Sequence, residues 1–299
     1  MKVLVCGGTG FIGSRLTRYL INQGLQVVVI ARHEPTSVSL GIQFYEADLM
    51  KPELFRMEWF EGVDAVVNLS GKNIFTFWSE KNKEIIWNSR VVVNRNLVNF
   101  ISRLKQKPKV FISASAVGYY GNRGEAELNE ESERGQGFLS ELCGEWEKEA
   151  REAEKLGLRS VQVRTAPVLA KGGGLVEQIM KSFHFGFTFV FGSGNQWFPW
   201  IHRDDLVRIY YAAITDKTFS GSLNACSPHP VRFREFLNYL RTFRKAVVIP
   251  LPKWILRIFL RETADVFLFS QKMVSAKLLK NNFQFCYPHL PDALKEIFS

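Results

Sequence analysis

The chain has 299 residues, of which 46% are hydrophobic, and its formal net charge is +10. This length can bury a large core and form more than one domain. No run of about 18 apolar residues suggests a membrane span, and no nucleic-acid-binding motif accompanies the basic charge. The four cysteines are scattered without metal-ligand spacing. We therefore expect a cytoplasmic protein with no metal site, no membrane span and no nucleic-acid partner.

The first 32 residues predict a strand, a glycine-rich turn, a helix and a second strand. The strands cover residues 1–6 and 26–31, and the helix runs to about Gln23. This order and spacing bind the pyrophosphate of a dinucleotide, because the turn lets the phosphates reach the N–H groups that open the helix. The cofactor contacts expected from the turn are Gly7, Thr9, Gly10, Phe11, Ile12 and Gly13.

The residues at the end of the second strand indicate whether the cofactor is NAD or NADP. An acid at this point would bond the ribose 2′-hydroxyl of NAD. The strand instead ends Ala31-Arg32, and the nearest acid, Glu34, comes too late to reach the ribose. Ala31 leaves room and the Arg32 guanidinium suits a phosphate, so we expect NADP(H) as the cofactor. The alternative is an ordinary surface arginine that happens to end a strand.

Strands and helices continue to alternate through the first two thirds of the chain. This alternation predicts an α/β fold with a Rossmann-like, doubly wound parallel sheet. Ligands of such sheets bind at the carboxyl ends of the strands. The further strands are predicted at residues 43–45, 64–68, 109–112 and 159–164, and the long helices at 79–104 and 138–156. The cofactor contacts expected at this edge are Leu69, Ser70, Gly71, Ser113, Arg164 and Val168.

Several motifs resemble those of one known family. They are the glycine turn, Asp48-Leu49, the Ser-Ala-Ser of residues 113–115 before Tyr119, and the stretch at 192–206. With these motifs the chain resembles the extended short-chain dehydrogenase/reductases, and more narrowly their atypical YfcH-like branch, the "epimerase family" proteins. The end of the chain, from about Val248, resembles the small domain of unknown function that closes those proteins.

The resemblance implies an organisation in two parts. A dinucleotide-binding Rossmann domain is expected at residues 1–170, with residues 200–226 returning to it. A smaller C-terminal substrate or lid domain is expected at residues 171–199 and 227–299. The aromatic run from Phe183 to Phe191 either lines an apolar pocket or packs this lid against the core.

The resemblance also implies a catalytic Ser, with Tyr and Lys spaced Tyr-x-x-x-Lys on the next helix. Ser115 matches the serine, but Leu139 and Cys143 stand where Tyr and Lys would be. No tyrosine in the chain has a lysine four residues later. Ordinary tyrosine-based catalysis is therefore in doubt.

Other residues could replace the missing pair. Tyr119 or Tyr120 could donate a proton, and so could Glu141, one turn from Leu139. Arg90, before the fifth strand, could supply the cation near the nicotinamide ribose or the phosphates. Each has a plainer interpretation, as a packed aromatic or as a solvated helix residue.

Two function classes stay open. The first is an NADP(H)-dependent oxidoreductase or epimerase-like enzyme acting on a small molecule, apolar or carbonyl-bearing. The second is a non-catalytic NADP(H)-binding sensor or scaffold. The sequence leaves the substrate and a homodimer open.

Overall fold

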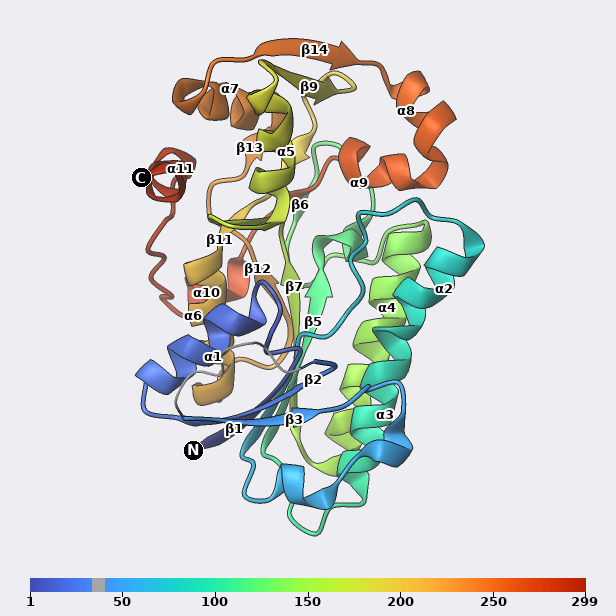
Figure 1. Ribbon diagram of the computed structural model, residues 1–299, viewed down its shortest axis with the longest axis vertical. Helices are drawn as coiled ribbons and strands as arrows, with labels where there is room; N and C mark the ends of the chain where they lie inside the picture. Colours follow the sequence, from blue (N-terminus) through green and yellow to red (C-terminus); the bar gives the residue numbers. More distant parts are fainter. Residues whose placement is uncertain (34–40) are drawn as a thin grey trace.

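A seven-stranded parallel sheet forms the centre of the molecule (Figure 1). The computed structural model describes residues 1–33 and 41–299. The strand order is β12-β7-β5-β4-β1-β2-β3. The chain adds β2 and β3 on one side of β1 and then adds β4 and the later strands on the other side, so the order of the strands reverses between β1 and β4. This arrangement confirms the predicted α/β, Rossmann-like class. The strands are β1 (Lys2–Cys6), β2 (Gln26–Ala31), β3 (Ile42–Glu46), β4 (Ala65–Asn68), β5 (Val110–Ala116), β7 (Arg159–Thr165) and β12 (Gly221–Ala225).

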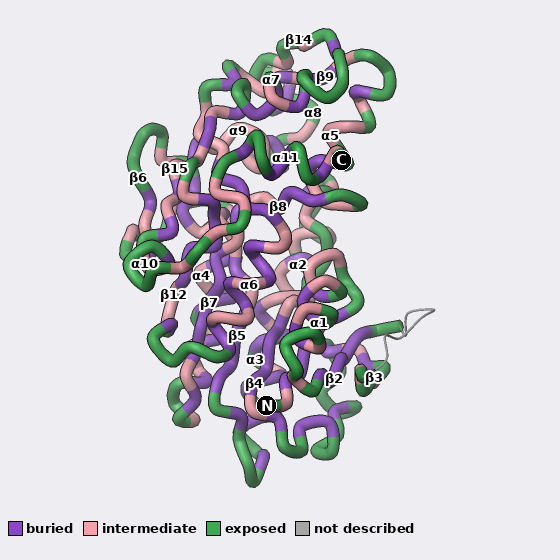
Figure 2. The backbone as a smooth tube through the Cα atoms, turned by 90° about the vertical axis from the view of Figure 1, so that its left-hand side faces the viewer, coloured by how far each residue is buried: buried purple, intermediate pink, exposed green. Residues whose placement is uncertain are grey.

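Helices cover both faces of this sheet, which is why its central strands are apolar on both sides. Alternate residues of one strand face opposite ways: Val3 and Val5 join one hydrophobic cluster, and Leu4 and Cys6 join another. Figure 2 shows the buried backbone following the strands of the sheet. One face is covered by α1 (Gly13–Asn22) and α6 (Arg203–Thr215), and the other by α3 (Val91–Ser102) and α4 (Phe138–Arg151), with α2 (Glu80–Asn88) beside them.

The helix predicted at residues 79–104 is two helices, α2 and α3, separated at Ser89 and Arg90. Side chains bind the carbonyl of Ile86, which in a continuous helix would accept the backbone N–H of Arg90. The Ser89 hydroxyl and the Arg90 guanidinium both donate to the carbonyl of Ile86, at 2.8 and 3.2 Å. The Arg90 N–H bonds instead to the carbonyl of Trp87 at 3.0 Å. The break therefore comes from local side-chain hydrogen bonds that compete with the helix.

Two other predicted boundaries shift by several residues, and one strand lies where none is predicted. The helix predicted at residues 138–156 ends at Arg151 and continues as a 3₁₀-helix over Glu152–Leu156. Strand β5 runs four residues past its predicted end, to Ala116. Strand β12 was not predicted, because its polar residues Ser222 and Asn224 hide the apolar pattern of a sheet strand.

A second group of elements lies beyond the carboxyl edge of the sheet (Figure 1). It packs around its own hydrophobic cluster, which includes Phe183, Val190, Phe236 and Leu294. Its elements are α5 (Gly174–His184), β9 (Phe187–Phe191), α7 (Phe233–Phe243), β14 (Val247–Leu251), α8 (Lys253–Leu260), α9 (Asp265–Leu268) and α11 (Leu290–Phe298). The short helix α10 (Ala276–Lys280) instead packs against β12, and its Leu278 joins a hydrophobic cluster of the sheet. We call this group the lid; its strands β9 and β14 run parallel.

Short strand pairs join the lid to the sheet region. The pair β8 with β11 and the pair β6 with β15 are parallel, and β10 with β13 is antiparallel. Their bounds are β6 (Glu127–Leu128), β8 (Val168–Leu169), β10 (Trp197–Phe198), β11 (Ile201–His202), β13 (Val231–Arg232) and β15 (Lys272–Met273). Within residues 1–33 and 41–299, no helix has the length and apolar character needed to cross a membrane.

Candidate functional site

A cavity of about 490 Å³ opens at the carboxyl ends of β1, β2 and β4, where the strand order reverses. We call it the sheet-edge cavity. Parallel sheets bind ligands at such switch points. Of the predicted cofactor contacts, it brings together Gly7, Thr9, Gly10, Ala31, Arg32, Leu69, Ser70 and Gly71.

The glycine turn forms one wall of this cavity and leaves no room for a side chain at Gly7 or Gly13. A Cβ on Gly7, which has φ +75°, would lie 3.0 Å from the backbone nitrogen of Ser70. A Cβ on Gly13 would lie 2.2 Å from the carbonyl oxygen of Gly7. Gly10, with its nearest contact at 3.4 Å, keeps the cavity side of the turn open. The turn therefore fits the close approach of a pyrophosphate to backbone N–H groups.

The rim of the sheet-edge cavity is basic. The exposed Arg32 at the end of β2 lines it, together with Lys72 and one carboxylate, Asp48. The Asp48 carboxylate accepts the backbone N–H of Met50 at 3.0 Å. An exposed guanidinium beside the second strand suits the extra phosphate of NADP. Glu34 lies outside the described residues.

Arg90 lies directly behind this cavity. Its guanidinium carbon would be 3.1 Å from a Cβ on Gly71, which lines the cavity. It donates to the carbonyl of Lys72 at 2.8 Å and lies 5.3 Å from the ring centre of Trp146. Burial lowers the pKa of Arg90 to about 10. Its hydrogen-bond partners among the described residues are all neutral, so its charge is available to a nearby anion.

Ser113 lies in a buried polar network beneath the sheet-edge cavity and does not line it. Its hydroxyl accepts from the Asn94 amide at 2.9 Å, and Asn94 also accepts from the Asn68 amide. The side-chain oxygen of Asn68 accepts the backbone N–H of Ser70 at 3.0 Å, which fixes the wall of the cavity. Asn68 and Asn94 were not predicted as site residues, because their role depends on contacts between distant elements.

Ser115, the predicted catalytic serine, lines neither cavity. Residues 111, 113 and 115 of β5 face α3 and α4, and the Ser115 hydroxyl donates to the buried carboxylate of Glu147 at 2.7 Å. Its neighbour Ala116 faces the opposite way and lines the second cavity described below. The alternation of side chains along a strand therefore takes the serine away from any molecule bound there.

Arg164 belongs to the same buried cluster. It makes a two-pronged ion pair with Glu147, at 2.8 and 2.9 Å, and also donates to the Tyr120 hydroxyl. Burial alone would lower the pKa of Arg164, but the hydrogen bonds to Glu147 raise it above its ordinary value. Tyr119 stacks on this guanidinium, with its ring centre 3.5 Å from the guanidinium carbon. Arg164 and Tyr119 therefore hold the strand ends together from outside both cavities.

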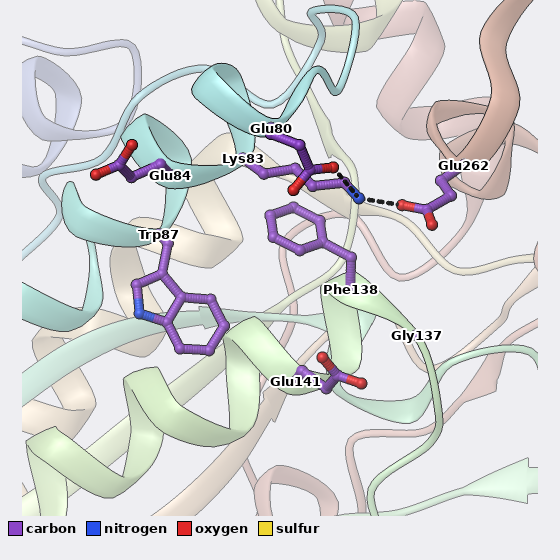
Figure 3. Close-up of a pocket in the computed structure, with 8 residues that line it drawn as sticks. All are labelled: Glu80, Lys83, Glu84, Trp87, Gly137, Phe138, Glu141 and Glu262. Carbon is purple, nitrogen blue, oxygen red and sulfur yellow. Dashed lines mark hydrogen bonds and ion pairs between the residues drawn. The ribbon is translucent and has the colours of Figure 1, made fainter.

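Glu141 is an exposed residue of a separate surface hollow (Figure 3). In that hollow Lys83 bonds Glu80 and Glu262, and the Glu141 carboxylate points to solvent near Phe138. Leu139 faces elsewhere, because residues two apart on a helix lie on nearly opposite sides. Glu141, predicted as a possible proton donor, therefore does not share the face of α4 on which Leu139 lies.

A second cavity, of about 320 Å³, lies between the carboxyl ends of β5 and β7 and the lid. We call it the lid cavity. Leu139 and Ala116 line it, whereas Cys143, at the position of the missing lysine, is buried, and burial raises its pKa to about 12. The predicted cofactor contacts Phe11 and Val168 line this cavity. The lid contributes mainly aromatic rings, from Phe191, Trp197, Phe198, Phe233, Phe267 and Phe269.

The two cavities flank the glycine turn. Gly10 lines the sheet-edge cavity, and the next residue, Phe11, lines the lid cavity. Ile12 lines neither and packs against the sheet. A dinucleotide whose pyrophosphate rests on this turn would therefore reach into both cavities with its two halves.

Comparison with known families agrees with this architecture. Residues 3–226 match the NAD dependent epimerase/dehydratase family, and residues 251–297 match a domain of unknown function, DUF1731. The chain belongs to this epimerase/dehydratase family. The predicted resemblance is thereby confirmed.

Relatives align over nearly the full length of the chain. The Arabidopsis thaliana "Epimerase family protein SDR39U1 homolog, chloroplastic" is 36% identical, covering 99% of this chain and 86% of its own. The crystal structure of human epimerase family protein SDR39U1 with NADPH is 32% identical, with a TM-score of 0.85 and coverage of 100% and 99%. The structure described as a nucleoside-diphosphate sugar epimerase from Corynebacterium glutamicum is 32% identical, with a TM-score of 0.80, and covers 100% of this chain and 58% of its own.

Proposed function

We propose that this protein is an atypical short-chain dehydrogenase/reductase that binds NADP(H) and transfers hydride to or from a small molecule in the lid cavity. The observation that carries the proposal is the position of the glycine turn between the two cavities, with Gly10 on one and Phe11 on the other. The NADPH in the related human structure supports the choice of cofactor.

The residues that would hold the cofactor divide between the two cavities. The turn would hold the pyrophosphate, and Arg32 would hold the additional phosphate. Arg90 would supply the cation that the missing lysine does not, because it lies against Gly71 and close to Cys143. When bound, NADPH supplies a hydride, and the lid would exclude water from the reacting atoms.

The alternative is a cofactor-binding sensor or scaffold without turnover. It is favoured by one observation: Ser115, Tyr119 and Glu141 all lie outside the lid cavity. A test of hydride transfer distinguishes the enzyme from the non-catalytic sensor or scaffold. Oxidation of bound NADPH by any member of a carbonyl panel, followed at 340 nm as about one turnover or more per protein, favours the enzyme.

Titration calorimetry with NADPH, NADP⁺, NADH and NAD⁺ tests the cofactor pocket. We expect NADPH and NADP⁺ to bind more tightly than NADH and NAD⁺. Arg32→Ala should weaken the binding of NADPH and NADP⁺ by roughly 10- to 100-fold, because a charge-assisted hydrogen bond is lost. NADH and NAD⁺ should change little. Arg18→Ala, an exposed arginine on α1 away from both cavities, is the matched control. Equal binding of NADPH by wild type and Arg32→Ala would overturn the role of Arg32.

We also propose the division of labour predicted from the sequence, with residues 1–170 and 200–226 binding the cofactor and residues 171–199 and 227–299 acting as the lid. The separate hydrophobic cluster of the lid supports it. A cytoplasmic location is supported by the four cysteines, none of which is paired in the described structure. A homodimer remains a proposal, tested by light scattering with and without NADPH.

A further inference from the structure

The lid cavity differs in chemistry from the sites that bind charged nucleotides. We propose that it takes an uncharged, largely apolar ring compound that offers hydrogen-bond donors, and that it rejects nucleoside diphosphate sugars. This inference rests on the proposed function for the location of the reacting partner and adds the class of substrate.

The walls of the cavity are suited to a flat apolar molecule. Phe191 and Phe267 pack with their ring centres 4.8 Å apart, and Phe198 and Phe233 pack at 5.8 Å. Phe75, from the loop before α2, lies 6.5 Å from Phe267 and adds a further ring. Clusters of this kind contribute binding through large apolar area and through offset or edge-to-face ring contacts. A compound with one or two fused rings matches the size and character of such a cavity.

The cavity also lacks the cations that a diphosphate requires. Among the described residues that line it there is no lysine, arginine or histidine, and Asp265 is its one ionisable side chain. Asp265 pairs with Arg257 at 2.6 Å, and burial raises the pKa of its carboxyl. A diphosphate would be removed from water beside a carboxylate, without a charged partner, which is strongly unfavourable.

Nearby cations are held behind the aromatic wall. Arg232 and Lys272 lie over the ring of Trp197, at 3.8 and 5.4 Å, and form ion pairs with Glu125 and Glu127. Arg203 lies over the ring of Phe11 at 4.9 Å. These three side chains do not line the cavity. The carboxylates of Glu125 and Glu127 balance the charges of Arg232 and Lys272, whereas Arg203 meets the cavity wall only through the ring of Phe11.

The uncharged polar side chains that line the cavity use their donor groups within the chain: the Thr165 hydroxyl donates to the carbonyl of Val163, and the Trp197 indole donates to Glu125. The amide N–H groups of Gln196 donate to the carbonyls of Phe191 and Phe267, and that of Gln271 donates to the carbonyl of Val117. No described group donates to the side-chain oxygen of either glutamine. These two oxygens therefore select a ligand that carries a hydroxyl or N–H group.

The test compares two probes on the full chain, with and without saturating NADPH. The neutral probe is 2-naphthol, and the charged probe is UDP-glucose. We expect 2-naphthol to bind at least tenfold more tightly than UDP-glucose. Tighter or equal binding of UDP-glucose would overturn the proposal.

A pair of variants locates the binding. Phe75 and Phe77 are similarly exposed, at 47% and 44%, but only Phe75 lines the cavity. Phe75→Ala should weaken the binding of 2-naphthol by roughly 2- to 10-fold, because one aromatic contact is lost. Phe77→Ala should leave the affinity for 2-naphthol unchanged. Equal effects of the two variants would show that the probe binds elsewhere, which also overturns the proposal.

The cofactor titration separates the two proposals. NADPH binding without preference for 2-naphthol would refute the substrate class alone and leave the proposed function intact. Failure to bind NADPH would refute the proposed function. The titration without cofactor would still decide the substrate class, because the cavity walls are all made by this chain.

Discussion

The sheet-edge cavity and the lid cavity meet at one glycine turn but offer opposite chemistry. The first has Arg32 and Lys72 on its rim and Arg90 behind it, against one carboxylate, Asp48. The second has aromatic walls and Asp265 as its one ionisable residue among the described lining. The contrast suits an anion on one side of the turn and, as we propose, an apolar molecule on the other. Membership in an epimerase family therefore does not by itself identify a sugar nucleotide as the substrate.

The largest expected effect removes the buried carboxylate that ties together the strand ends beneath both cavities. Glu147 is fully buried and accepts from Ser115 and from both prongs of Arg164. Glu147→Ala leaves the buried Arg164 guanidinium without its carboxylate partner and should cost about 3–5 kcal/mol of unfolding free energy. Urea unfolding measures it. If the lid cavity were independent of this cluster, 2-naphthol would still bind normally to the folded fraction.

The control for that variant is on the same helix. Glu145 is half-buried and pairs with Lys148 at 3.3 Å near the surface. Glu145→Ala should change the unfolding free energy by less than about 1 kcal/mol. Equal losses for the two variants would contradict the central place given to the Glu147 cluster.

The sequence predicted the sheet-edge cavity better than the lid cavity, for a physical reason. The glycine turn and Arg32 are local features, since seven neighbouring residues and one strand end determine them. The lid cavity is assembled from segments far apart in the chain, such as Phe11, Leu139 and Phe267. No spacing rule connects those segments, so an aromatic run could be read equally as packing or as a pocket.

Ser115 shows how a motif can be displaced by one residue. The motif places a serine near the end of β5, but the alternation of the strand decides whether residue 115 or 116 faces the lid cavity. The buried partner Glu147, 32 residues away, settles it in favour of Ala116. The break at Arg90 was equally hidden, because the residues around it include no glycine or proline to mark it.

A smaller effect is expected at Arg90, which lies behind the sheet-edge cavity against Gly71. Arg90→Ala should weaken the binding of NADPH by roughly tenfold, because a charged hydrogen-bond donor is lost. Arg90→Lys should recover part of the lost affinity. Calorimetry measures both, with Arg103→Ala at the exposed end of α3 as control. Unchanged NADPH affinity in Arg90→Ala would mean that the guanidinium serves only to hold the carbonyls of Ile86 and Lys72.

The smallest expected effect concerns the attachment of the lid wall. The exposed Glu125 carboxylate accepts from Arg232 and from the Trp197 indole, and these hydrogen bonds lower its pKa to about 2. Because the folded pKa is depressed, the pair stabilises the folded state above the ordinary pKa of 4.5 and loses this effect as the pH falls toward 2. The difference in thermal midpoint between wild type and Glu125→Gln should therefore be small at pH 7 and smaller still at pH 3. Glu133→Gln, an exposed neighbour, should show no such dependence. A constant difference across this range would mean that Glu125 does not hold Trp197 through its charge, and the wall of the lid cavity would then depend on ring packing alone.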